Sequence, residues 1–262
     1  VNYEAYVLNS SENGLLVAHR EGLLVVDKGM QTPRVLLQGL DSTITQLEPS
    51  RFDKTIIYAL GNYDLFVLSN NTGQWQIKQK IPLEEVGSDS LVELASGEIW
   101  ISDNYSGPQR WRLDVRTHVL MEKKVFGKKE GLPINGEASQ HLYRLDDKLH
   151  LVLGEAGYVF DGKRFKPDTA PPLTLMKRPH ELYVAQTSGG SYAFTTREIW
   201  QRKKGEAEWQ ALRISTGSAA GYGTVRLNHD GVVRISTWGG ILQYDDKQET
   251  VPLEPLLLSM EY

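Results

Sequence analysis

The stretch LHLVLGEAGYVFDGKRF, residues 149–165, decides the fold. It holds two short runs in which apolar residues alternate, separated by Gly154-Glu155-Ala156-Gly157 and followed by Asp161-Gly162. Side chains on a strand point to alternate faces, and clusters of Gly and Asp favour tight turns, so the pattern predicts a β-hairpin. A single hairpin is only marginally stable in water, so this one needs further strands to pack against.

Similar hairpins recur along the whole chain. Each follows an anchor residue, and the anchors are Gly14, Lys54, Gly97, Lys148, Gly190 and Gly231. Consecutive anchors are 40, 43, 51, 42 and 41 residues apart. An alternating run precedes most of the hairpins and a short strand-like run follows most of them, which makes four strands per unit. Four-stranded units of about 40–45 residues are typical of the blades of a β-propeller.

Six units account for nearly the whole chain, at about residues 1–40, 41–82, 83–130, 131–172, 173–215 and 216–255. Helical periodicity is not sustained for three turns, which argues against an α/β fold. We therefore predict an all-β fold, a β-propeller of four-stranded antiparallel blades with six blades; the alternative is part of a seven-bladed ring. Pro252 and Pro255 would interrupt a strand, so we expect the propeller to occupy residues 1–255 and residues 256–262 to lead into a following domain.

Composition limits the function. The chain has 262 residues and a formal net charge of −4, which does not suggest nucleic-acid binding. It has no Cys, which excludes disulfides, thiol catalysis and Cys-bound zinc. No apolar run approaches the roughly 18–20 residues that span a bilayer. The chain starts VNYEAY, without Met or a signal-like segment, so we expect a mature form or a piece of a longer protein.

Residues 131–165 carry a more specific pattern, formed by Gly131-Leu132-Pro133, Asn135, Asp146, Leu149, Gly154, Gly157, Phe160-Asp161-Gly162 and Phe165. This pattern resembles the two-component-regulator propeller repeat, and GEIWIS at 97–102 and HDGVVRISTWGGILQYD at 229–245 are similar to it. The resemblance implies a periplasmic sensor domain of a bacterial membrane receptor. It also implies that a β-sandwich, a membrane helix and a cytoplasmic histidine kinase or diguanylate cyclase follow in the parent chain.

The sequence shows no constellation typical of an active site or a metal site. None of the six His residues forms an H-E-x-x-H or close H-x-H pair. There is no G-x-S-x-G elbow, and GSAAGYG at 217–223 lacks the Lys-Ser/Thr of a P-loop. We therefore expect no catalytic residues, no metal and no cofactor.

The turns inside the hairpins are the best candidates for a binding site, because loops on a rigid scaffold are where binding residues concentrate. In a propeller these turns gather on one face. Several carry aromatic or Arg side chains that turn chemistry does not require, beside Asn and Asp, a combination suited to stacking on sugar rings and binding their hydroxyl groups. The predicted ligand-binding residues are Arg20, Asn62, Tyr63, Asn104, Tyr105, Glu155, Arg197 and Trp238.

Three functions are compatible with these observations. The first is a sensor that binds a small polar ligand, such as an oligosaccharide, and signals to the next domain. The second is a protein-interaction propeller whose partner is another copy of itself, forming a homodimer, or another receptor subunit. The third is a propeller lyase or hydrolase.

Several residues of the repeat are expected to have structural roles and not functional ones. We expect Trp100 in the core, and Asp27, Asp114, Asp161 and Asp245 in turns.

Overall fold

A computed structural model of the chain describes residues 5–11, 14–19, 22–27, 32–38, 43–84, 90–134, 139–177, 182–186, 189–195, 198–211, 222–227, 233–237, 240–245 and 248–252. Arg20, Arg197, Trp238 and the tail 256–262, on which part of the sequence analysis rests, lie outside these residues. The chain divides into two compact units, an N-terminal unit (Val1–Thr169) and a C-terminal unit (Ala170–Tyr262).

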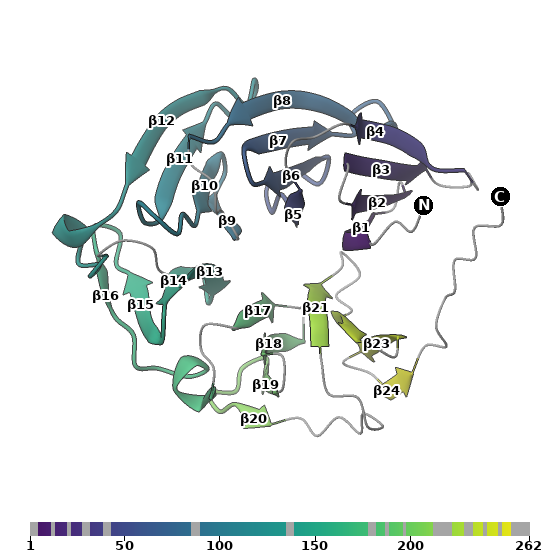
Figure 1. Cartoon of the computed structure of the whole chain (residues 1–262). Helices are drawn as coiled ribbons and strands as arrows, with labels where there is room; N and C mark the ends of the chain where they lie inside the picture. The colour runs from purple at the N-terminus through teal and green to yellow at the C-terminus, as the bar shows by residue number, and fades with distance from the viewer. Residues whose placement is uncertain are drawn as a thin grey trace. The chain divides into compact units, whose positions relative to one another are not determined.

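Regular structure in the described residues is β, apart from two short 3₁₀ helices, η1 (Lys128–Glu130) and η2 (Leu173–Leu175). These residues hold six four-stranded sheets, in which successive strands pair antiparallel (Figure 1). The four sheets of the N-terminal unit are β1 (Ala5–Ser11), β2 (Gly14–His19), β3 (Gly22–Asp27) and β4 (Arg34–Gln38); β5 (Ile44–Pro49), β6 (Ile56–Gly61), β7 (Asp64–Ser69) and β8 (Gln76–Pro82); β9 (Leu91–Ala95), β10 (Glu98–Ile101), β11 (Gln109–Leu113) and β12 (Leu120–Val125); and β13 (Gln140–Leu145), β14 (Lys148–Leu153), β15 (Ala156–Phe160) and β16 (Phe165–Pro167).

The C-terminal unit has two sheets of the same topology. They are β17 (Tyr183–Gln186), β18 (Gly190–Phe194), β19 (Ile199–Lys203) and β20 (Gln210–Ala211); and β21 (Tyr222–Leu227), β22 (Val233–Thr237), β23 (Gly240–Asp245) and β24 (Gln248–Pro252). The predicted all-β fold of four-stranded antiparallel blades is confirmed. Within the described residues, no helix has the length and apolar character that crossing a membrane would need.

The hairpin at 149–165 forms as its sequence predicts. Leu153 pairs with Ala156 across the turn Gly154-Glu155, and Gly154 has φ +59°, in the left-handed region that favours glycine. After β15, the N–H groups of Lys163 and Arg164 donate to Asp161 Oδ1, at 3.0 and 2.9 Å. Asp161 is therefore a turn residue, as its place in the repeat suggests.

Asp114 has the same role in the third sheet. Its Oδ1 accepts hydrogen bonds from the N–H groups of Arg116 and Thr117, at 3.0 and 2.8 Å. Gly131, from the Gly-Leu-Pro motif, is required by packing. A Cβ at position 131 would lie 2.4 Å from the carbonyl oxygen of Phe165, so a side chain there would force the backbone apart.

Alternate residues of one strand enter different hydrophobic cores. On β6, Ile57 and Ala59 pack into a core shared with the first sheet, whereas Ile56, Tyr58 and Leu60 pack into a core shared with the third. A third core lies between the third and fourth sheets. Because side chains alternate with a period of two, a sheet can bury both of its faces and so pack against two neighbours.

Trp100 on β10 is fully buried in the third core, as expected. Its ring centroid lies 4.7 Å from that of Phe126 and 4.8 Å from that of Phe160, and Phe165 approaches it edge-on at 6.0 Å. Phe160 and Phe165 belong to the repeat motif of the fourth sheet. The motif aromatics therefore pack one sheet onto the next, and tilted and edge-on ring pairs add to the energy of area burial.

Trp100→Ala should lower the free energy of unfolding by about 3–5 kcal/mol, because it leaves a large cavity between two sheets. Urea denaturation measures the change. Met121→Ala on β12 is the control: this side chain is 71% exposed, and its loss should change stability by less than about 0.5 kcal/mol. Equal losses in the two variants would contradict the central role of Trp100.

Candidate functional site

Five predicted site residues lie in turns of the N-terminal unit. Asn62-Tyr63, Asn104-Tyr105 and Glu155 each stand between the second and third strands of a sheet. The three sheets are consecutive and share one topology, so these turns lie at the same ends of their strands. Tyr63 and Tyr105 are 43% and 49% exposed, and Glu155 is exposed as well. Their role in binding a ligand stays a prediction.

A buried carboxylate organises the longest of these turns, between β10 and β11. Asp103 Oδ1 accepts hydrogen bonds from the N–H groups of Tyr105 and Ser106, at 2.9 and 3.2 Å. Asp103 Oδ2 accepts from the Ser106 hydroxyl and from Gln109 Nε2, the latter at 2.7 Å. A buried charge is tolerated only when it is well hydrogen-bonded, so these contacts hold the turn in one conformation. Tyr105 thus stands exposed on a fixed backbone.

The same turn is attached to the neighbouring sheet. Gln140, at the start of β13, donates from its backbone N–H to Asn104 Oδ1 at 3.1 Å and from Nε2 to the Asp103 carbonyl at 2.6 Å. Tyr63 is fixed through its carbonyl oxygen, which accepts a hydrogen bond from Leu83 N–H at 2.7 Å. Of the predicted site residues, Asn104 therefore has a clear structural task, in addition to any contact with a ligand.

First strands of adjacent sheets are joined by side chains. Both the N–H and the carbonyl of Leu91 on β9 bond to the side-chain amide of Gln46 on β5, at 2.7 and 2.9 Å. Ser90 Oγ accepts a hydrogen bond from Leu142 N–H on β13 at 2.8 Å. These bonds satisfy backbone groups at the inner edge of each sheet, where Figure 1 shows β5, β9 and β13.

A second polar cluster lies at the other ends of the strands and was missed by the sequence analysis. Glu93 on β9 is buried and accepts hydrogen bonds from the Tyr58 hydroxyl at 3.1 Å and from Arg51 N–H at 2.7 Å. Burial and the Glu93 carboxylate raise the pKa of Tyr58 above its ordinary value. A charged residue inside an alternating apolar run, such as Glu93 in SLVELAS, is the feature of the sequence that could have indicated this buried polar cluster.

Two arginines of this cluster meet one carboxylate. Arg51 Nη2 lies 2.8 Å from Asp147 Oδ1, and Arg144 Nη1 lies 3.7 Å from the same oxygen. Arg51 follows β5, Arg144 is on β13, and Asp147 is in the turn between β13 and β14, so the contact joins the second sheet to the fourth. Burial and the nearby Arg51 lower the pKa of Arg144 from its ordinary value.

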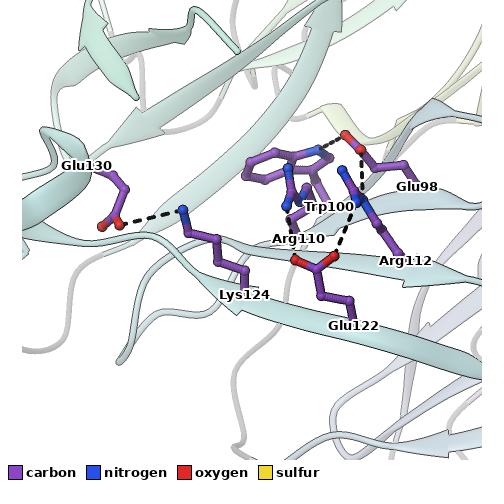
Figure 2. A network of polar contacts seen from close by, with 7 residues as sticks. All are labelled: Glu98, Trp100, Arg110, Arg112, Glu122, Lys124 and Glu130. Carbon is purple, nitrogen blue, oxygen red and sulfur yellow. Dashed lines mark hydrogen bonds and ion pairs between the residues drawn. The ribbon is translucent and has the colours of Figure 1, made fainter. Parts of the chain in front are cut away.

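Charges on the third sheet neutralise one another (Figure 2). Arg110 and Arg112 both pair with Glu122, at 3.2 Å each. Arg112 also approaches Glu98 at 3.8 Å. Glu98 in turn accepts a hydrogen bond from the Trp100 indole N–H at 3.1 Å, so the network anchors the core tryptophan.

The Lys-rich stretch at 121–131 continues this pattern, since Lys124 pairs with Glu130 at 3.8 Å and Lys123 with Glu84 at 2.6 Å. Two of the four lysines of this stretch, Lys123 and Lys124, are therefore paired with a carboxylate. Where the structure describes the chain, no group of three or more His, Asp or Glu residues is placed to hold a metal ion.

No family model matches the sequence, and no curated protein does. Solved structures match nearly the whole chain. The extracellular domain of the hybrid two-component system BT4673 from B. thetaiotaomicron has a TM-score of 0.60 and 12% identity, over 96% of this chain and 33% of that one. That of BT3049 from the same organism has a TM-score of 0.58 and 15% identity, over 89% of this chain and 33% of that one.

A streptogramin B lyase structure has a TM-score of 0.64 and 15% identity, over 94% of this chain and 81% of that one. At such low identities the likeness shows the fold alone, and it supports the β-propeller fold of the chain. The chain spans about a third of the length of the two extracellular domains.

Asp103→Ala should release the turn that carries Tyr105 and lower the free energy of unfolding by about 2–3 kcal/mol, because four hydrogen bonds to a charged group are lost. Hydrogen exchange of the amides of Tyr105 and Ser106, with urea denaturation, measures both effects. Asp103→Asn keeps one acceptor oxygen and should lose less. Unchanged protection of both amides in Asp103→Ala would show that the turn is held by other contacts.

Proposed function

We propose that this chain is the ligand-sensing domain of a bacterial signal-transduction receptor and that it binds a small polar ligand, such as an oligosaccharide. One observation carries the proposal: a tyrosine that packing does not require is held exposed on a turn fixed by a buried carboxylate. Tyr105 is about half exposed, and the backbone beside it is fixed through Asp103.

Such an arrangement favours binding for two reasons. An ordered turn loses little conformational entropy when a ligand arrives, so more of the contact energy appears as affinity. An exposed aromatic ring also offers an apolar face with a polar hydroxyl at its edge. Tyr63, on the corresponding turn of the neighbouring sheet, offers a second ring of the same kind. A sugar presents an apolar ring face and a rim of hydroxyl groups, which matches both features.

The repeat pattern and the fold support a location outside the cytoplasm, as part of a membrane receptor. The repeat at 131–165 resembles that of periplasmic sensor propellers, and the fold is similar to the extracellular domains of two hybrid two-component systems. We infer that the chain lies on the periplasmic side of the inner membrane. A downstream β-sandwich and a membrane-anchored kinase or diguanylate cyclase of the same parent chain would then receive the signal.

Tyr105→Ala and Tyr63→Ala should each weaken the binding of an oligosaccharide about three- to tenfold, because each removes one stacking surface. A glycan screen followed by calorimetry on each hit measures the change. Phe52→Ala is the matched control, since Phe52 is also about half exposed but lies between β5 and β6, at the other ends of the strands.

The variants also separate the alternatives. Unchanged affinity in both tyrosine variants would place the ligand elsewhere. Conversion of a hit to a product during the titration would identify a lyase or hydrolase instead of a sensor.

A further inference from the structure

In the cluster of Arg51, Arg144 and Asp147, the two cationic side chains are mostly buried and the anionic side chain is exposed. The side chains of Arg51 and Arg144 are 32% and 21% exposed, whereas that of Asp147 is 78% exposed. An ordinary surface ion pair has both partners in solvent and contributes little. Here the two arginine side chains are mostly covered, whereas the aspartate side chain that pairs with them is mostly in solvent.

Arg144 has unused hydrogen-bonding capacity. Its guanidinium carries five N–H donors, yet within the described part of the chain its one close polar contact is the ion pair with Asp147 at 3.7 Å. This distance is too long for a good hydrogen bond. A guanidinium fork matches the two oxygens of a carboxylate, and Asp147 does not use that geometry.

We propose that Arg51 and Arg144 form a binding site for the carboxylate of an acidic ligand, such as a uronic acid, and that the chain's own Asp147 competes for this site. The ligand's carboxylate takes the place of the Asp147 carboxylate and accepts hydrogen bonds from both guanidinium groups. The interaction is non-covalent. Because Asp147 pairs with the same guanidinium groups, it competes with the ligand and raises the ligand concentration needed for binding.

The charges around the arginines select a singly charged ligand. Glu48 and Glu93 are the other charged groups that act on Arg144. Both already accept hydrogen bonds, Glu48 from Gln46 Nε2 at 3.1 Å and Glu93 from Tyr58 and Arg51 N–H. A ligand with one carboxylate adds a single negative charge next to the two glutamates. A phosphate or another multiply charged anion would add more and would be repelled more strongly.

Asp147 is placed where it can move away. It shares a two-residue turn with Asp146, between the paired residues Leu145 and Lys148, and both Asp residues have positive φ, +51° and +58°. This left-handed conformation is disfavoured for residues other than Gly, although Asn and Asp tolerate it best. The exposed tip of such a turn can rearrange without disturbing the strands.

This site is separate from the turn tyrosines. Strand β6 has six residues, and Arg51 precedes it while Tyr63 follows it. At about 3.3 Å per residue, the two ends of the strand lie roughly 20 Å apart. A single small ligand cannot reach both, so the carboxylate site and the proposed oligosaccharide site can be tested independently.

The test is calorimetric titration of the 262-residue chain with D-glucuronate, and with D-glucose as the neutral match. The parent should bind glucuronate more tightly than glucose at this site. Asp147→Asn keeps the turn conformation and removes the competing charge. If Asp147 occupies the arginines nine-tenths of the time, this variant should bind glucuronate roughly tenfold more tightly. Arg144→Met should reduce glucuronate binding to the level of glucose, and Arg51→Met should do the same.

The gain of affinity on removing a negative charge is the decisive result, because general weakening or partial unfolding cannot produce it. Met121→Ala, an exposed residue on β12 that belongs to neither proposed site, should leave glucuronate binding unchanged. Unchanged or weaker binding by Asp147→Asn would overturn the proposal, and so would full binding by a folded Arg144→Met. Should Arg144→Met unfold in thermal melts, Arg51→Met and Asp147→Asn still decide the outcome.

Discussion

Apolar side chains on both faces of each central sheet hold the N-terminal unit together. Alternate residues of β6 enter the core with the first sheet or the core with the third, and Trp100 meets phenylalanines of the fourth sheet. Each of the three cores described in the N-terminal unit therefore depends on two units of the repeat. A motif residue such as Phe165, on the fourth sheet, therefore also packs against the third sheet, through Trp100.

Polar side chains also hold neighbouring sheets together, by hydrogen bonds to backbone groups. The first strands of adjacent sheets are not paired as strands, so their backbone groups need other partners. Gln46 and Ser90 supply them, each by a bond that crosses from one sheet to the next. Gln140 on β13 makes a similar crossing bond to the Asp103 carbonyl, in the turn between β10 and β11. Buried polar groups are costly unless they are paired, so these residues restrict how neighbouring sheets can align. The alignment of the sheets also sets where the turns that carry Tyr63 and Tyr105 lie relative to each other.

The two ends of the strands have different chemistry. One end carries exposed tyrosines on turns fixed by backbone and carboxylate contacts, which suits a neutral ligand with apolar faces. The other end carries a chain of charged groups from Glu93 through Arg51 to Asp147, which suits an acidic one. The network around Glu122, by contrast, is linked through Glu98 to the indole of Trp100 and serves the core.

The sequence by itself determined the repeating hairpin, the four strands per unit, the turn role of Asp161 and the burial of Trp100. These follow from local rules: the two-residue period of a strand, the conformational demands of turns and the size of an apolar ring. It also predicted that Tyr63 and Tyr105 lie in turns. Only the tertiary structure decided that Asp103 holds the turn of Tyr105, that Asn104 bonds to Gln140, and that Arg51 meets Asp147, 96 residues away. The physical reason is that such contacts depend on how one sheet packs against the next, which no periodicity within a single unit encodes.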